Sequence, residues 1–168
     1  MHPRLQLGSR ARPLNFTVRP PHSVPTSQNL CWRSPGRPED SPDHRPGRYF
    51  AETVRAGLLA AGWDVDAPDD WRDVGWLVRL QRNGASIAIF LARLGQGDEW
   101  MLQIAPERVA GLIGRVLGRA NSATSSDVLT AAHQVHSTLS SVDGVSSMRW
   151  RWDGRPGDGN ASPQPAAV

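Results

Sequence analysis

The dipeptide Asn83-Gly84 separates two runs in which apolar and polar residues alternate. Asn-Gly readily adopts two positive φ angles, and this geometry closes a two-residue type I′ β-hairpin. Side chains alternate between the two faces of a strand, so the turn also sets which residues share a face. Pairing outward from the turn predicts three apolar pairs on one face: Leu80 with Ile87, Val78 with Ile89, and Trp76 with Leu91.

A second reversal is predicted at residues 95–98, where glycine and aspartate interrupt the apolar pattern. It pairs the middle strand with a third one, so that Leu91 faces Leu102 and Ile89 faces Ile104. Two independent turns therefore place the same residues on one apolar face. The stretch from residue 71 to residue 104 is predicted to form a three-stranded antiparallel meander.

Prolines divide the chain into three parts. Nine of them precede residue 47, only Pro68 and Pro106 lie between residues 47 and 153, and three follow. A segment rich in Pro and Arg, with few branched aliphatic residues, buries too little apolar surface to offset the entropy cost of ordering. We therefore predict a disordered Pro/Arg-rich arm over residues 1–46, a single domain over residues 47–153, and a disordered tail over residues 154–168.

The high isoelectric point does not by itself indicate a nucleic-acid-binding protein. The sequence pI is about 10.3, but the formal net charge is only +3 and the chain contains no lysine. Because almost nothing titrates between neutrality and the arginine range, a small positive excess raises the pI strongly. Residues 1–46 carry seven Arg against three acidic residues, whereas residues 47–153 carry eleven Arg against twelve. The arm is basic and the predicted domain is nearly neutral.

Three segments outside the meander have helical periodicity. The first covers residues 48–61, and a second is predicted to start at Pro106 and to continue to about residue 117. The third is opened by a capping box between Thr124 and Asp127 and continues to about Ser140. Its predicted inward face consists of Val128, Ala131, Ala132, Val135 and Leu139.

The residues after Asp143-Gly144 predict a final strand, because Met148, Trp150 and Trp152 alternate with polar residues. The predicted element order is α-β-β-β-α-α-β. The predicted fold class is α+β: an antiparallel sheet of three to four strands, made of the β-meander and the C-terminal strand, with the helices packed on one face.

Cysteine usage and hydropathy exclude several classes of protein. Cys31 is the only cysteine, so an intrachain disulfide and a cysteine-based metal site are excluded. No apolar run approaches the roughly 20 residues that span a bilayer, and the N-terminus lacks the apolar segment of a signal peptide. We expect a cytoplasmic protein with no membrane association.

The second face of the meander is the strongest candidate for binding. The register that sets the core places six residues on this opposite face: Leu77, Arg79, Phe90, Ala92, Met101 and Gln103. If the helices cover only the first face, these residues form a surface of the aromatic, Met and Arg composition that is typical of protein interfaces. If a helix or the arm covers them, they are ordinary core. A free sheet edge offers a further binding mode by strand addition.

A first alternative involves the C-terminal strand. The run Arg149, Trp150, Arg151 and Trp152 could bind RNA or single-stranded nucleic acid together with the basic arm. Period-two alternation is the simpler interpretation, with the tryptophans inward and the arginines in solvent.

His133 and His136, three residues apart on a predicted helix, could approach one metal ion. A zinc site needs further ligands, and both histidines lie at or beyond the margin of the apolar stripe. The acidic cluster at residues 64–70 lacks the central Gly and terminal Glu of a calcium loop. We therefore predict no catalytic residue, no metal site and no cofactor, and a metal-dependent enzyme using the two histidines is the least favoured alternative.

Taken together, these patterns favour a small binding or adaptor protein that acts without catalysis. Its expected partner is an unidentified protein or a second copy of the chain, bound through the second sheet face. Nucleic-acid binding through the C-terminal Arg/Trp strand is the main alternative.

Overall fold

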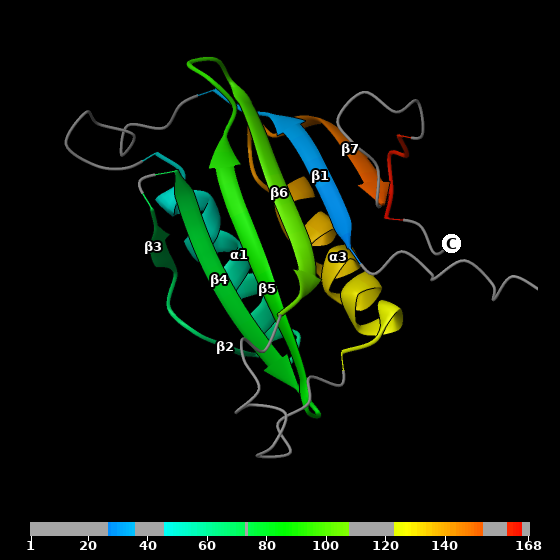
Figure 1. Cartoon of the computed structure of the whole chain (residues 1–168). Helices are drawn as coiled ribbons and strands as arrows, with labels where there is room; N and C mark the ends of the chain where they lie inside the picture. The colour runs from blue at the N-terminus through cyan, green and yellow to red at the C-terminus, as the bar shows by residue number, and fades with distance from the viewer. Residues whose placement is uncertain (1–26, 36–45, 73, 108–122, 153–160, 166–168) are drawn as a thin grey trace, which may run out of the picture.

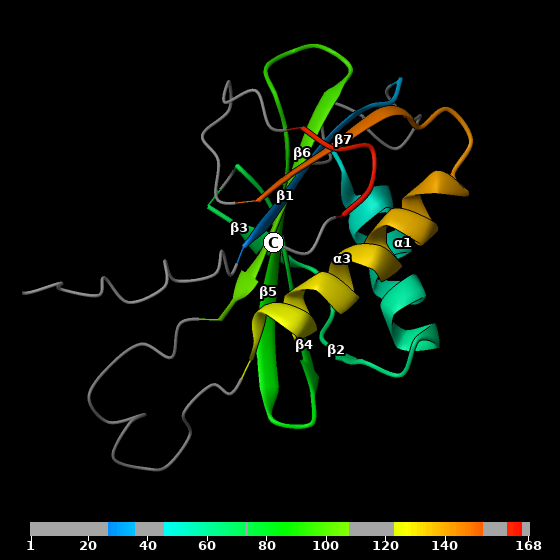
Figure 2. The ribbon, with the colours of Figure 1, turned by 90° about the vertical axis from the view of Figure 1, so that its right-hand side faces the viewer.

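The computed structural model describes residues 27–35, 46–72, 74–107, 123–152 and 161–165. Within these ranges, seven strands form one antiparallel sheet, and both helices pack on the same face of it (Figures 1 and 2). The strand order is β2-β4-β5-β6-β1-β7, and β3 also pairs with β4. The predicted α+β class and antiparallel sheet are confirmed, whereas the number of strands and the order of elements differ from those predicted.

The elements in chain order are β1 (Gln28–Arg33), α1 (Arg48–Ala60), β2 (Asp64–Val65), β3 (Asp69–Trp71), β4 (Gly75–Arg82), β5 (Ala85–Arg93), β6 (Glu99–Pro106), α3 (Ser125–Ser140) and β7 (Ser146–Trp152). None of the helices in the described ranges has the length and apolar character needed to cross a bilayer.

The predicted register of the meander is confirmed. Asn83 and Gly84 both have positive φ, 52° and 81°, as a type I′ turn requires. The pairs predicted between β4 and β5, and between β5 and β6, are those observed. The face that packs on the helices carries the buried residues Val78, Leu80, Ile87, Ile89, Leu91, Leu102 and Ile104.

The predicted boundary of the N-terminal arm is wrong. The arm predicted over residues 1–46 includes residues 28–33, but these form β1, which lies inside the sheet between β6 and β7. Leu30 and Trp32 are fully buried, and Ser34 N continues the pairing by donating to Asp98 O at 2.9 Å. The sequence of this strand does alternate between its two faces, although prolines flank it on both sides. One face carries Gln28, Leu30 and Trp32, and the other carries Asn29, Cys31 and Arg33. Two neighbouring strands thus supply the burial that the segment cannot supply alone.

The prediction that a helix starts at Pro106 is also wrong for the first residues of that helix. Pro106 ends β6 opposite Ile87, and the backbone N–H of Glu107 donates to Ser86 O at 2.9 Å. Proline is tolerated at the end of a strand because it removes only one ladder hydrogen bond. The remainder of that predicted helix lies outside the described residues.

The two other predicted helices are confirmed. In α3 the capping box joins Thr124 and Asp127, and its hydrogen bonds lower the pKa of the Asp127 carboxyl. Its five buried residues are the five that helical periodicity predicted. The helices approach each other closely at Gly57, where a Cβ would clash with the Thr138 side chain, and Gln134 Nε2 donates to Gly57 O at 3.2 Å.

The predicted C-terminal tail also contacts the domain. Trp150 and Ser162 exchange two backbone hydrogen bonds, of 2.7 and 2.9 Å. Part of the segment assigned to a disordered tail therefore pairs with β7. Residues 154–160 and 166–168 of that segment, like most of the predicted arm, lie outside the described residues.

Candidate binding face of the sheet

The strands present their second set of side chains away from α1 and α3. Figure 1 shows the sheet from this side, with both helices behind it, and Figure 2 shows it edge-on. We call this surface the open face. By register it comprises Asn29, Cys31, Asp69, Trp71, Leu77, Arg79, Phe90, Ala92, Met101, Gln103, Arg149 and Arg151. All six residues predicted for protein binding lie on it together, but Ala92 is buried, whereas the other five are partly or fully exposed.

Two rows of side chains cross the whole sheet. The ladder registers connect the first row as Asp69, Leu77, Phe90, Gln103, Asn29 and Arg151. The second row contains Trp71, Ala92, Met101, Cys31 and Arg149. The first row is apolar on β4 and β5 and polar on β6 and β1, whereas the second is apolar from Trp71 to Met101. Each row has an arginine on β7 at one end.

The apolar part of the open face is extended by Trp71, which is not among the six predicted residues. Its ring lies edge-on to Phe90, with centroids 4.8 Å apart, and it remains 38% exposed. Trp71 pairs with Gly75 of β4. A side chain at position 75 is disfavoured, because a Cβ there would clash with the carbonyl oxygen of Leu91. Trp71 could be found only once β3 was known to pair with β4.

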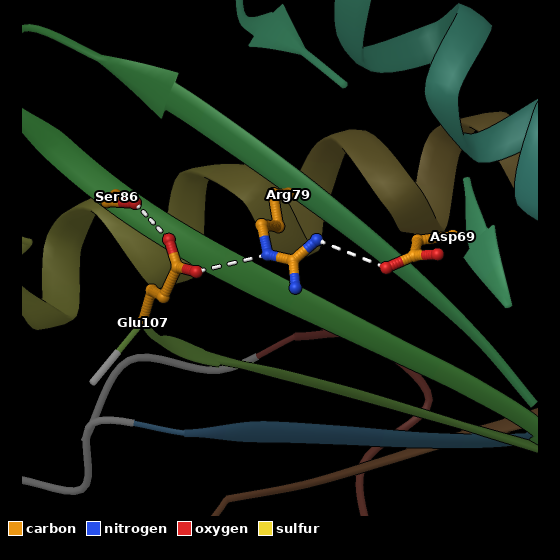
Figure 3. A network of polar contacts seen from close by, with 4 residues as sticks. All are labelled: Asp69, Arg79, Ser86 and Glu107. Atoms are coloured by element: carbon orange, nitrogen blue, oxygen red, sulfur yellow. Dashed lines mark hydrogen bonds and ion pairs between the residues drawn. The ribbon is translucent and has the colours of Figure 1, made fainter. Parts of the chain in front are cut away.

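A polar network lies beside this apolar part (Figure 3). Arg79 Nε donates to Glu107 Oε1 at 3.2 Å, and its Nη1 lies 3.6 Å from Asp69 Oδ2. Glu107 Oε2 in turn accepts from Ser86 Oγ at 2.6 Å. The Arg79 side chain is held between two carboxylates and is still 37% exposed. Such a preorganised charge suits hydrogen bonding to a partner, because little side-chain entropy remains to be lost on binding.

The two edges of the sheet carry opposite charge. Four exposed aspartates and no basic residue lie in the segment that forms β2 and β3, residues 64–71: Asp64, Asp66, Asp69 and Asp70. Strand β7 at the other edge carries Arg149 and Arg151 and no acidic residue. Within the described ranges, no group of three or more His, Cys, Asp or Glu side chains is placed to hold a metal ion.

A pocket of about 400 Å³ lies where the pairing of β1 with β7 is irregular. Among its lining residues are Cys31, Arg33, Glu99 and Arg149. Burial raises the pKa of the Cys31 thiol, while the Arg151 guanidinium opposes this rise and Glu99 adds to it. The thiol is therefore protonated at neutral pH, which makes it a weak nucleophile.

The alternative nucleic-acid surface is not assembled as proposed. Trp150 is fully buried and donates its indole N–H to His136 Nδ1 at 3.0 Å, so it cannot stack on a base without unpacking the core. Arg149 and Arg151 lie on the open face. The side chain of Trp152 lies outside the described part of the structure.

The two histidines have different environments. His133 is exposed, whereas His136 is partly buried against Trp150. Burial lowers the pKa of His136, and the neighbouring charge of His133 lowers it further. The Trp150 hydrogen bond requires an unprotonated Nδ1, which gives His136 a structural role between α3 and β7.

We expect the free energy of unfolding to fall as the pH is lowered from about 8 to about 5, and His136 to account for part of that fall. The folded state binds a proton on His136 more weakly than the unfolded state does. Stability is therefore highest above the ordinary histidine pKa and decreases as the pH falls through the lowered pKa of the folded state. Urea unfolding at a series of pH values would measure this dependence.

The matched variant is His136→Asn, whose side-chain amide can accept the indole N–H but does not titrate in this range. We expect it to flatten the pH profile, whereas the exposed His133→Gln should leave most of the slope. Equal slopes for the wild-type protein and His136→Asn would contradict the assignment.

No protein-family model, no curated protein and no solved structure matches this chain. The arrangement of its own residues is therefore the basis for a functional proposal.

Proposed function

We propose that this protein is a small cytoplasmic binding module that acts without catalysis and binds a folded protein through its open face. The observation that supports this proposal most directly is the position of the two helices. Both pack on the other face, and they leave Leu77, Phe90 and Met101 only half-buried.

The composition of the open face supports a protein partner. Aromatic residues, Met and Arg are enriched in protein interfaces, and here Trp71, Phe90, Met101 and Arg79 lie on neighbouring strands. Strands of a seven-stranded sheet hold these side chains in fixed relative positions. Binding to such a preorganised surface costs less conformational entropy than binding to loops.

The proposal is tested by placing a photoreactive residue, p-benzoylphenylalanine, at position 103 of the full-length protein in its source cells. Gln103 is exposed at the centre of the open face. The matched control places the same residue at position 59, since Leu59 is a large exposed apolar residue on α1, in the other layer. We expect a defined crosslinked protein from position 103 and none from position 59.

Phe90→Asp should reduce the yield of this adduct more than tenfold, because it puts a charge in the apolar centre of the face. Leu59→Asp should not reduce it. Circular dichroism and urea unfolding establish that each variant is folded. Trp71→Asp, at an exposed position of the same face, is the second variant if Phe90→Asp destabilises the domain. Equal adducts from positions 103 and 59, or an adduct removed by nuclease, would overturn the proposal.

A further inference from the structure

We propose that the partner on the open face is a second copy of this chain, related to the first by a two-fold axis that runs along the strands between β5 and β6. This inference rests on the proposed function, because it names the occupant of the same face. The observation that carries it is the asymmetric charge of the two sheet edges.

The row from Asp69 to Arg151 contains one residue from each of the six strands that it crosses. Its centre lies between Phe90 on β5 and Gln103 on β6. A two-fold axis along the strands at this point reverses the row on the second copy. It therefore places Asp69 opposite Arg151 of the other copy, and Phe90 opposite Gln103 of the other copy.

Charge selects this axis over the other face-to-face arrangement. An axis perpendicular to the strands would place β7 on β7 and β3 on β3, so that like charges meet at both edges. The axis along the strands instead places Asp69 opposite Arg151 at both edges. In an interface between identical copies every favourable contact occurs twice, so this complementarity is doubled.

The second row supports the same axis. Reversal places Trp71, at the acidic edge, opposite Arg149 on the other copy. Trp71 is 38% exposed, and an arginine over a tryptophan ring is a favourable contact. At the centre, the partly buried Met101 lies over the position of Ala92 of the other copy.

The size of the face and the charge of the chain fit a dimer. Six strand positions about 4.8 Å apart and roughly seven residues long span roughly 600 Å² per copy before side-chain relief is counted. Stable interfaces bury about 800 Å² per partner. The net charge of +3 is small, so overall repulsion between two copies is weak.

The first measurement is sedimentation velocity of the purified full-length protein over a wide range of concentration. We expect a monomer–dimer equilibrium that Phe90→Asp weakens more than tenfold and that Leu59→Asp leaves unchanged. Gln103→Asp is the second variant, because Gln103 is exposed and its replacement does not disturb the core. A chain that stays monomeric at every concentration overturns the inference.

The second measurement tests the axis with two full-length variants in a Cys31→Ser background, Asp69→Cys and Arg151→Cys. Packed sheets lie about 10 Å apart, so a bismaleimide of about that length can join the new thiols. In the mixed dimer one native Asp69–Arg151 pair remains at the other edge. We expect the mixture to crosslink at least tenfold faster than either variant alone. Self-crosslinking of either variant at the rate of the mixture overturns the axis.

The two proposals fail in different ways. A monomeric chain whose position 103 still crosslinks to a different protein rejects the second copy and retains the binding module. A chain whose position 103 yields no protein adduct, and which stays monomeric, rejects both.

Discussion

A chain that begins at Gly47 is expected not to fold, although the sequence pattern places the start of the domain there. Such a chain lacks β1, which lies between β6 and β7 and buries Leu30 and Trp32. Truncation of a buried large apolar side chain typically costs about 2–5 kcal/mol. Loss of two such side chains, together with both ladders of β1, approaches the 5–15 kcal/mol that is typical of the whole stability of a domain.

Far-ultraviolet circular dichroism and urea unfolding measure this effect. The matched control is a chain that begins at Ser27, immediately before β1, and it is expected to unfold at the urea concentration of the full chain. A cooperative unfolding transition in the shorter chain, at the same urea concentration as in the control, would show that β1 is dispensable.

Trp100→Ala is expected to lower the free energy of unfolding by about 3–5 kcal/mol, the cost of removing a fully buried aromatic side chain. The Trp100 ring lies 4.9 Å from Phe50 and 6.2 Å from Trp32, measured between centroids, so it joins β6 to α1 and β1. Its indole N–H also donates to Ser34 O at 3.3 Å.

Two variants calibrate this prediction in urea. Trp100→Phe retains part of the ring contact and loses the hydrogen bond, so its loss of stability should be clearly smaller than that of Trp100→Ala. Val74→Ala removes methyl groups from a side chain that is 58% exposed, and it should change the stability by less than about 0.5 kcal/mol. A Trp100→Ala loss as small as that of Val74→Ala would contradict the central place of this ring in the core.

Local chemistry explains the parts of the fold that could be predicted. The Asn83-Gly84 turn sets the register of β4 on β5, and this register in turn decides which side chains reach the open face. The capping box of α3 and the helical periodicity of α1 likewise depend on residues close together in the chain. Because the open-face positions follow from the same alternation as the core positions, the six predicted residues were found together.

The parts that could not be predicted depend on contacts between distant segments. Arg79, Glu107 and Asp69 form one network only because β3 returns to β4 and Pro106 continues β6 instead of starting a helix. The hydrogen bond from Trp150 to His136 depends on the packing of α3 against β7. Neither contact has a periodic signal in the sequence, since a hydrogen bond between side chains leaves no pattern along a strand.

Turn geometry, alternation and capping act over a few residues, so they were enough to predict the antiparallel meander, its two faces, and the helices α1 and α3. Contacts between distant segments place a strand from the proline-rich N-terminal region between β6 and β7, and put the acidic and basic edges at opposite ends of the sheet. Strand β1 becomes stable only when β6 and β7 satisfy its backbone and bury Leu30 and Trp32.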